Sequence, residues 1–377
     1  MGEIFSNVLE IRWEMVLMWL IGALLIWLAI AKEMEPTLLL PMGFGAILAN
    51  LPMSGAINQV INGTVEEGVL DTLFNAGIAN ELFPLLLFIG IGAMIDFGPL
   101  LSNPRMLLFG AAAQFGIFFT FSVAALIGFD IKDAAAIGII GAADGPTSIF
   151  VANYFNSNYI GAIIVAAYSY MALVPIIQPP VIKLITTKKE RLIKMPYKPK
   201  EISKTVRILF PIVTTAIVGI LSPRSVALVG FLMFGNLLRE VNVLRMLSES
   251  AQKELANLIT IFLGITIAAR MRWEMFVKID TLAIILLGLI AFIFDTVGGV
   301  LFAKVINIFS KKKVNPMIGA AGISAFPMSS RVVHKMGLEE DPTNHLLMHA
   351  AGANVAGQIA SVVAGGVMIA LVEKLIG

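Results

Sequence analysis

One acidic residue, Asp144, stands between glycine and proline in the run GAADGPTS at residues 141–148, with very apolar sequence on both sides. A charge deep in a bilayer costs about 2.5–3.5 kcal/mol on insertion scales, so such a residue indicates a function. Glycine and proline interrupt a helix and free backbone carbonyls, which can join a carboxylate around a small hard cation. The run therefore predicts a sodium or proton site. The alternative is a carboxylate that only caps a helix, beside Thr147 and Ser148.

A second interrupted run, NPMIGAAGISAFP at residues 315–327, offers neutral oxygens in apolar sequence. The amide of Asn315, the hydroxyl of Ser324 and the unwound carbonyls are hard ligands of the kind that alkali cations take. Both side chains could equally be neutral caps at a helix break. Arg331 follows a few residues later, and it either binds an anion or extends to the cytoplasmic surface.

Polar groups also interrupt the last apolar stretch of each half of the chain. Tyr170 in the first half and Asn354 in the second stand at roughly equivalent positions. A tyrosine in a membrane span is most often a packing or interfacial residue with one hydrogen bond. Beside a cation it could instead deliver a proton, because a nearby positive charge raises its acidity. Asp295 is the second-best buried carboxylate, and it could pair with Lys304 or line a helix interface.

The composition indicates the class of protein. The chain has 377 residues, of which 58% are hydrophobic and 14% are charged, and its mean hydropathy is +0.88. A soluble domain carries about 25% charged residues, so the sequence predicts a polytopic membrane protein. The absence of cysteine excludes disulfides and thiolate metal sites. A net charge of +2 gives no reason to expect a nucleic-acid partner, and P-loop, HExxH and GxSxG motifs are absent.

Apolar segments recur along the whole chain. They lie at about 14–32, 36–51, 82–97, 104–128, 131–155, 158–186, 207–222, 224–240, 254–271, 280–309, 314–333 and 342–375. Several are shorter than the ~20 residues that a straight spanning helix needs, so we expect an all-α membrane fold with broken helices. Residues 1–13 are predicted to form an interfacial segment with Trp13 at the level of the lipid headgroups. The acidic start predicts no cleavable signal peptide.

The two halves of the chain look like an internal repeat. Four matches occur in the same order, at offsets of about 174 to 190 residues: 43–48 with 233–238, 87–91 with 261–265, 140–144 with 318–322, and 146–148 with 327–329. Self-similarity at matching places is typical of transporters whose binding site lies at the repeat interface. We expect repeat 1 at 14–186 with a broken element at 131–155, and repeat 2 at 207–377 with a broken element at 313–335.

The basic residues predict the orientation. The linker at 187–206 is the most polar stretch, and by the positive-inside rule it is cytoplasmic, as are Arg105 and the lysines at 311–313. Each repeat then has five crossings and one broken hairpin, and an odd number of crossings makes the repeats inverted. The hairpins would enter from opposite faces and meet near the midplane. Whether each is a true hairpin or an interrupted span stays open.

Several of these stretches carry a family resemblance. They are GAADGPTSIF at 141–150, AYSYMALVP at 167–175, QPP at 178–180, GNLLRE at 235–240, SAFPMSSR at 324–331 and GANVAGQ at 352–358. From about residue 14 to 376 the chain resembles the β subunits of the biotin-dependent, sodium-pumping decarboxylases of the glutaconyl-CoA, methylmalonyl-CoA and oxaloacetate type. The short N-terminus favours a β subunit that works with an acyl-CoA carboxyltransferase.

The resemblance implies a function and a setting. A carboxyltransferase subunit moves a carboxylate from a substrate to biotin on a carrier protein or domain. The β subunit then decarboxylates the carboxybiotin, consumes a proton and exports sodium. The resemblance also implies a small membrane subunit as a partner, a homotrimer, an elevator-like movement and a location in the plasma (inner) membrane of a prokaryote.

The resemblance further implies roles for single residues. Asp144 falls on a sodium ligand, and Tyr170 falls on a residue linked to the sodium and proton step. Arg331 falls on a candidate anchor for the carboxybiotin or a gate. The other sodium-site candidates that the resemblance implies are Asn315, Gly319, Ser324 and Asn354.

Two other functions remain open from the sequence. One is a stand-alone sodium-coupled secondary transporter, either a sodium/proton antiporter or a sodium/carboxylate symporter, with the same inverted repeats. The other is a structural membrane anchor for a soluble complex. The buried carboxylate of Asp144 argues against the anchor, because an anchor has no use for a charge in the membrane.

Overall fold

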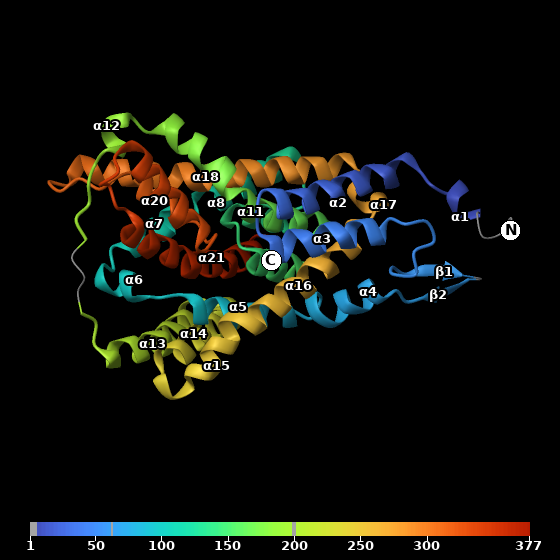
Figure 1. The fold of residues 1–377 in the computed structure, drawn as a ribbon, viewed down its shortest axis with the longest axis horizontal. Coiled ribbons are helices and arrows are strands. Elements are labelled where there is room, and N and C mark those ends of the chain that lie inside the picture. The colour runs from blue at the N-terminus through green and yellow to red at the C-terminus, as the bar shows by residue number, and fades with distance from the viewer. Residues whose placement is uncertain (1–5, 62, 198–200) are drawn as a thin grey trace.

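The structure is a computed structural model, and it describes residues 6–61, 63–197 and 201–377. Within these ranges, six helices are long and apolar enough to cross a membrane, or seven if the bent pair Val69–Ile78 and Leu82–Met94 forms one span. The prediction of an all-α polytopic membrane protein is therefore confirmed. Most helices run along the long axis of the molecule, with the N-terminal end and a small β-hairpin at one end and α12 and α20 at the other (Figure 1).

The first half of the chain is mostly helical. Its elements are α1 (Ser6–Leu9), α2 (Trp13–Ala31), α3 (Pro36–Ala49), β1 (Gln59–Ile61), β2 (Thr64–Glu66), α4 (Val69–Leu73), η1 (Phe74–Ile78), α5 (Leu82–Met94), α6 (Gly98–Ser102), α7 (Met106–Ala112), α8 (Phe115–Ile127), α9 (Ile131–Gly138), η2 (Ile139–Ala142), α10 (Gly145–Tyr154) and α11 (Ile160–Ile185). The predicted interfacial segment falls partly on residues 1–5, which lie outside the described residues. Trp13 is 68% exposed at the start of α2.

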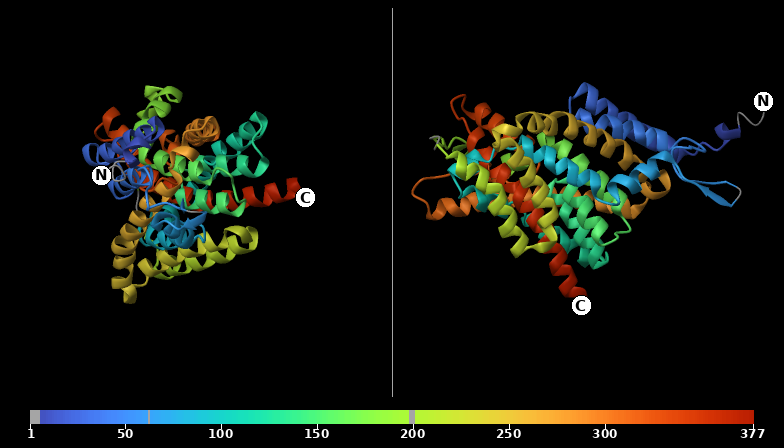
Figure 2. Two further views of the ribbon diagram at one scale, coloured as in Figure 1. Left: turned by 90° about the vertical axis from the view of Figure 1, so that its right-hand side faces the viewer. Right: turned by 90° about the horizontal axis from the view of Figure 1, so that it is seen from below.

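The second half of the chain is also mostly helical, and the short helix α12 in the linker leads into it. Its elements are α12 (Lys188–Arg191), α13 (Lys204–Leu221), η3 (Pro223–Ser225), α14 (Val226–Glu240), η4 (Asn242–Leu244), α15 (Arg245–Ser250), η5 (Ala251–Leu255), α16 (Ala256–Ile267), η6 (Ala268–Arg270), α17 (Trp273–Phe276), α18 (Ile279–Phe309), α19 (Met317–Ala320), α20 (Met328–Glu340) and α21 (Leu347–Ile376). Residues 198–200 of the predicted linker lie outside the described residues. The C-terminal end of α21 projects from the body of the molecule (Figure 2).

Both runs that the sequence singled out are interrupted helices. In the first, the chain leaves the helix at Ala143, which has the left-handed φ of 51°, and at the extended Asp144. The helix restarts at Gly145 with Pro146 in its first turn. Backbone amides in the first turn have no partner within the helix, so a proline there costs no hydrogen bond. In the second, residues 321–327 are unwound between α19 and α20.

Helices of the first half pack against helices of the second half, and we call these contacts the exchanged pairs. Helix α3 packs against α16 and α5 against α14, while α7 packs against α21 and α11 against α18. Glycine permits the close approach of α5 and α14. A Cβ on Gly92 would lie 1.8 Å from the carbonyl oxygen of Leu232, and one on Gly235 would lie 2.0 Å from that of Ile89. Small residues at helix contacts are typical of membrane bundles.

The two interrupted elements lie in the most buried part of the molecule. Every residue from 133 to 152 is buried, and so is every residue from 315 to 325. A helix that is enclosed on all sides needs apolar residues all round, and alanine, glycine and isoleucine supply them here. Helices α11, α18 and α21 form much of this enclosure. The fold thus surrounds Asp144 with protein.

Candidate ion-binding site

Asp144 is a buried carboxylate held only by neutral donors. Its Oδ2 accepts hydrogen bonds from Thr147 Oγ1 at 2.6 Å and from Ser361 Oγ of α21 at 2.8 Å, and its Oδ1 accepts from the Thr147 amide at 3.4 Å. The residue is 4% exposed. It therefore caps α10, and it has no ion pair with any described residue. A capping carboxylate without a cationic partner, at this depth, suits a cation as its counter-charge.

The two helix breaks contact each other directly. Ser324 donates to the carbonyl oxygen of Ala142 twice, from its amide at 3.2 Å and from its hydroxyl at 2.6 Å. Ala142 is the last residue of η2, two positions before Asp144. The structure thus brings Ser324 into the neighbourhood of Asp144 and places two unwound stretches face to face.

Several buried polar oxygens near the breaks have no hydrogen-bond partner among the described residues; one is Oδ2 of Asp295, beside Gly141, and two others belong to Asn354 and Tyr168. Asn354 donates from Nδ2 to the carbonyl oxygen of Ile323 at 2.7 Å, but its Oδ1 is bare. The hydroxyl of Tyr168 is bare as well, and its ring lies against Gly145, where a Cβ would come within 2.2 Å. Buried polar atoms in proteins are nearly always satisfied, so these two are candidates to contact a ligand.

A cavity of about 230 Å³ gives access to this site. Its lining includes Asp144, Ser324, Tyr168 and Gln358 on one side and residues of α3, α5 and α16 on the other. Glu35, which precedes α3, also lines it. The cavity therefore separates the interrupted helices from the exchanged pairs α3–α16 and α5–α14, and it leads to the carboxylate.

Tyr170 points away from this cavity. Its hydroxyl donates to the carbonyl oxygen of Ile285 in α18, and its ring stacks on Phe292 with the centroids 6.5 Å apart. Tyr168, two residues earlier on α11, lines the cavity instead. Sequence reasoning passed over Tyr168, because the spacing of two tyrosines within one turn did not say which of them faces the aspartate.

Asn315 and Gly319 have structural contacts of their own. Asn315 donates from Nδ2 to the carbonyl oxygens of Arg191 at 2.8 Å and Ile193 at 2.9 Å, and its Oδ1 accepts from the Met317 amide at 3.1 Å. Gly319 packs against Gly299 of α18, so closely that a Cβ would lie 1.9 Å from the Gly299 carbonyl oxygen. The structure does not bring these two residues to the carboxylate of Asp144.

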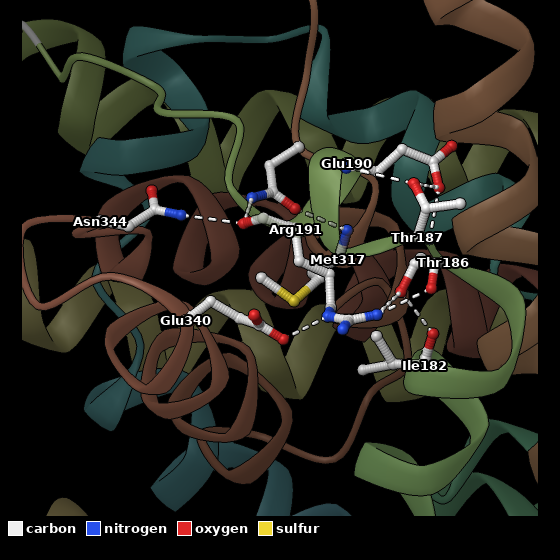
Figure 3. Close-up of polar contacts among 9 residues, drawn as sticks. Ile182, Thr186, Thr187, Glu190, Arg191, Met317, Glu340 and Asn344 are labelled. Carbon is white, nitrogen blue, oxygen red and sulfur yellow. Dashed lines mark hydrogen bonds and ion pairs between the residues drawn. The ribbon is translucent and has the colours of Figure 1, made fainter.

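Arg191 fastens the linker to the second interrupted element (Figure 3). Its guanidinium forms an ion pair with Glu340 at the end of α20 and donates to the carbonyl oxygen of Thr186 at 2.7 Å. Its own carbonyl oxygen also accepts from Asn344 Nδ2 at 3.0 Å. The amide of Asn315 is part of this linker contact rather than of the cavity.

Arg331 is exposed on α20 and lies near Glu35. Burial raises the pKa of Glu35, and the positive charge of Arg331 acts in the opposite direction. Glu35 lines the cavity, whereas Arg331 does not.

Asp295 lines a helix interface and does not pair with Lys304. Its Oδ1 accepts from the amide of Ile117 in α8 at 3.1 Å, and the residue is fully buried. Lys304 forms an ion pair with Glu190 of the linker at 3.1 Å instead. Of the two alternatives for Asp295, the structure supports the interface.

Comparison with known proteins identifies the family. A family model described as "Na+-transporting oxaloacetate decarboxylase beta subunit" matches residues 14–372. The chain belongs to this family. Its sequence is 50% identical to the methylmalonyl-CoA decarboxylase subunit beta of Veillonella parvula, over 95% of this chain and 93% of that one.

Two further relatives are similar over almost their whole length. The chain is 48% identical to the glutaconyl-CoA decarboxylase subunit beta of Acidaminococcus fermentans, over 97% of this chain and 96% of that one. It is 45% identical to the oxaloacetate decarboxylase beta chain 2 of Salmonella typhi, over 94% of each chain. The resemblance drawn from the motifs is confirmed. The protein is a multi-pass membrane subunit of a sodium-translocating decarboxylase.

Proposed function

We propose that this subunit decarboxylates carboxybiotin delivered by a partner, consumes a proton in doing so, and exports sodium that binds at Asp144. The observation that carries the proposal is the buried carboxylate at the contact of two helix breaks, with neutral donors and a cavity leading to it. Relatives that are named as decarboxylase β subunits support it. In this proposal sodium is the transported substrate.

The proposed sodium ligands combine one charge with neutral oxygens. Asp144 provides the carboxylate, and the bare Oδ1 of Asn354 and the hydroxyl oxygen of Ser324 are the neutral oxygens placed around the breaks. Ser324 donates its hydrogen to Ala142, so the lone pairs of its oxygen stay free to accept a cation. Asn315 and Gly319 belong to the proposal as supports that hold the second break in place.

Tyr170 and Arg331 complete the assignment from the family. Tyr170 is proposed to take part in the proton step. Tyr168 on the same helix, α11, is proposed to take part as well, because it lines the cavity and its hydroxyl has no hydrogen-bond partner among the described residues. Arg331 is proposed to bind the carboxylate of carboxybiotin, since a guanidinium matches a planar carboxylate with two hydrogen bonds. Its proximity to Glu35 supports that position.

We also propose that the two halves are inverted repeats, at 14–186 and 207–377, which move relative to one another like an elevator. The helix pairs support a two-fold relation. In the expected repeat α3 corresponds to α14 and α5 to α16, and α3 packs against α16 just as α14 packs against α5. The cavity between the interrupted helices and α3, α5 and α16 supports a movable boundary at that place.

Sodium and decarboxylation would then share one conformational step. Binding of sodium neutralises Asp144 and favours closure of the site, while the empty carboxylate does not. A ligand shifts a conformational equilibrium only by the difference in its affinity for the two states, so this differential affinity is the coupling. Transfer of the carboxybiotin from water to an apolar site favours the loss of carbon dioxide, and Arg331 would hold the group until closure.

The setting of the proposal follows the family. We propose a biotin carrier protein or domain, a carboxyltransferase subunit and a small membrane subunit as partners, a homotrimer as the assembly, and the plasma membrane of a prokaryote as the location. The linker at 187–206 would face the cytoplasm.

Asp144→Asn tests the proposal, because it removes the charge and keeps the shape. We expect the variant to lose sodium activation of the decarboxylation of free carboxybiotin, by at least about 100-fold in the half-saturating sodium concentration, since a buried charge pair is worth about 3–5 kcal/mol. The measurement is the initial rate against sodium concentration with the purified full chain. Asp280→Asn, which changes an exposed carboxylate on α18, is the matched control. Unchanged sodium activation in Asp144→Asn would contradict the proposal.

The stand-alone transporter differs in one measurable respect. It predicts sodium-driven exchange in proteoliposomes at the same rate with and without carboxybiotin. Our proposal predicts net sodium movement only when carboxybiotin is present and is consumed.

A further inference from the structure

A second, larger concavity lies at the end of the molecule that the basic residues mark as cytoplasmic. We call it the basic pocket. It has a volume of about 670 Å³, and segments that are far apart in the sequence form it: residues around α6 and α7, the linker at 194–197, the end of α18 with the lysine loop, and the start of α21. The basic side chains that line it are Arg105, Lys194, Lys312 and Lys313.

The charge in the basic pocket is not balanced by its own lining, which contains no acidic residue. Lys194 has a partner outside the lining, Asp341 at 2.8 Å, and Lys313 donates to the carbonyl oxygen of Asn307. Arg105 and Lys312 are exposed and have no ion pair within residues 6–61, 63–197 and 201–377.

One further polar atom of the lining is bare. The Nε2 of His349 is buried without a hydrogen-bond partner among the described residues. Like charges that converge on a concave surface raise the local positive potential, and an anion relieves it. The side chains of Arg105 and Lys312 therefore give the basic pocket the charge and the N–H donors of an anion site.

A separate apolar groove lies on two of the helices that line the basic pocket. Its volume is about 410 Å³, and it is lined by Ala111, Ala112, Phe115, Gly298 and Leu301 together with Gln114, Phe118 and Phe302. These residues come from α7, α8 and α18, and two of these helices, α7 and α18, also line the basic pocket through Met106 and Ile306. The groove lies one to three turns further along the helices and away from the charged end.

Large apolar residues of this groove are exposed on the surface of the chain. Phe115 is 51% exposed and Leu301 is 47% exposed. In a membrane protein such surfaces contact lipid tails. Basic pockets between spanning helices on the cytoplasmic side bind the headgroups of anionic lipids. The combination of a basic end and an apolar trough matches a whole lipid rather than a free anion.

We propose that this place binds one anionic phospholipid of the cytoplasmic leaflet, with its phosphate at Arg105 and Lys312 and an acyl chain along Ala111 and Gly298. The site shares no lining residue with the cavity at Asp144. Its occupancy is independent of decarboxylation, and it can be tested on protein that is not turning over.

The headgroup is tested by removing two charges. Native mass spectrometry of the delipidated full chain, titrated with phosphatidylglycerol or phosphatidylcholine, gives the affinity for each lipid. We expect selective binding of one phosphatidylglycerol, and a loss of roughly 30-fold in Arg105→Gln/Lys312→Gln, because each basic residue near an anionic lipid contributes about 1 kcal/mol. Lys188→Gln/Lys189→Gln removes the same charge from exposed positions on α12 and should bind like the original chain. Equal binding by the two double variants would overturn the proposal.

The acyl-chain groove is tested by filling it. Ala111 is exposed in the groove, so Ala111→Phe should weaken phosphatidylglycerol binding by about tenfold or more while leaving the charges in place. Leu126→Phe, at an 86% exposed position of α8, is the control. Inorganic phosphate alone should not compete at millimolar concentration. Competition by phosphate with full tolerance of Ala111→Phe would show a free-anion site and refute the lipid. Loss of the oligomer in Ala111→Phe with lipid still bound would assign the groove to a subunit contact and refute it as well.

Discussion

The two helix breaks differ in charge and in how completely their polar groups are satisfied. The first break is short, carries Asp144, and receives Ser361 from α21. The second break is longer and uncharged, and Gln178 of α11 closes it by donating to the carbonyl oxygen of Ala320 at 2.7 Å while accepting from Ser329 at 2.9 Å. The hydroxyl of Tyr168, which has no hydrogen-bond partner among the described residues, lies against the first break at Gly145, whereas the side chains of Gln178 and Asn354 donate to carbonyl oxygens at the second.

This difference separates two tasks that a transport site needs. Neutral, hydrogen-bonded backbone has a low free-energy cost in a dry interior, whereas a carboxylate without a cationic partner has a high one. In the proposed cycle, the second break can therefore keep its shape in every state. The first break would gain stability when the proposed cation binds, which makes it the place where we propose that the ion controls the conformation.

The largest effect is expected from a methyl group at Gly319, in α19 just before the second break. In Gly319→Ala the new Cβ would meet the backbone of Gly299 at 1.9 Å, and backbone cannot move aside. We expect a loss of about 3 kcal/mol or failure to fold. In Gly141→Ala beside the first break the Cβ would meet Asp295 Oδ2 at 2.7 Å and the Cβ of Ala291 at 2.8 Å, contacts that are longer than the 1.9 Å backbone contact of Gly319→Ala, so a smaller loss of about 1–2 kcal/mol is expected. The melting temperatures of the two variants in detergent measure the contrast. Equal melting temperatures would remove the distinction between a rigid and an adaptable break.

A matched pair of amides comes next. Asn354→Ala removes the bare oxygen near the breaks, so the half-saturating sodium concentration for decarboxylation should rise about tenfold, as expected for one lost ligand worth about 1.4 kcal/mol. Gln178→Ala opens the second break and should lower the melting temperature through a loss of about 1–2 kcal/mol. It should leave the sodium dependence unchanged. A shift of sodium affinity in Gln178→Ala that matches the shift in Asn354→Ala would mean that both breaks serve the ion.

The smallest effect concerns the end of the second interrupted element. Hydrogen bonds from Lys194 and Thr343 hold the pKa of Asp341 below its usual range. A carboxyl whose pKa is lowered by folding stabilises the protein above its unfolded pKa of about 3.9, and this contribution disappears as the pH falls through the folded value. Asp341→Asn should therefore lower the melting temperature slightly at pH 7. The difference from the original chain should shrink below about pH 4. A difference that stays constant with pH would show that Asp341 acts through packing alone.

Much of the architecture was predictable from the composition and from the positions of glycine and proline within the apolar segments. The interruptions at Asp144 and after Ala320 follow from glycine and proline, and the apolar segments correspond to helices. These features are local, because a residue without a Cβ or without an amide hydrogen changes the backbone wherever it stands. The family also followed from short motifs around those interruptions.

The direction of side chains at the site was not predictable in the same way. Tyr168 and Tyr170 lie within one turn of α11, and only the packing of α18 against that helix sends Tyr170 to Ile285. Asn315 was expected near the ion, but its amide is used by the carbonyl oxygens of the linker, more than a hundred residues away in the sequence. Such long-range hydrogen bonds depend on the whole fold, and the local sequence contains no trace of them.

The bond between Ser361 and Asp144 spans 217 residues, almost the entire remainder of the chain after the aspartate. At a synthesis rate of about 5–20 residues per second, the aspartate leaves the ribosome roughly 10–40 s before its partner exists. Until α21 has been synthesised, Asp144 therefore lacks this hydrogen-bond donor. The proposed ion site can be completed only after that point, so a chain whose synthesis stops before α21 would lack the donor from Ser361 to Asp144.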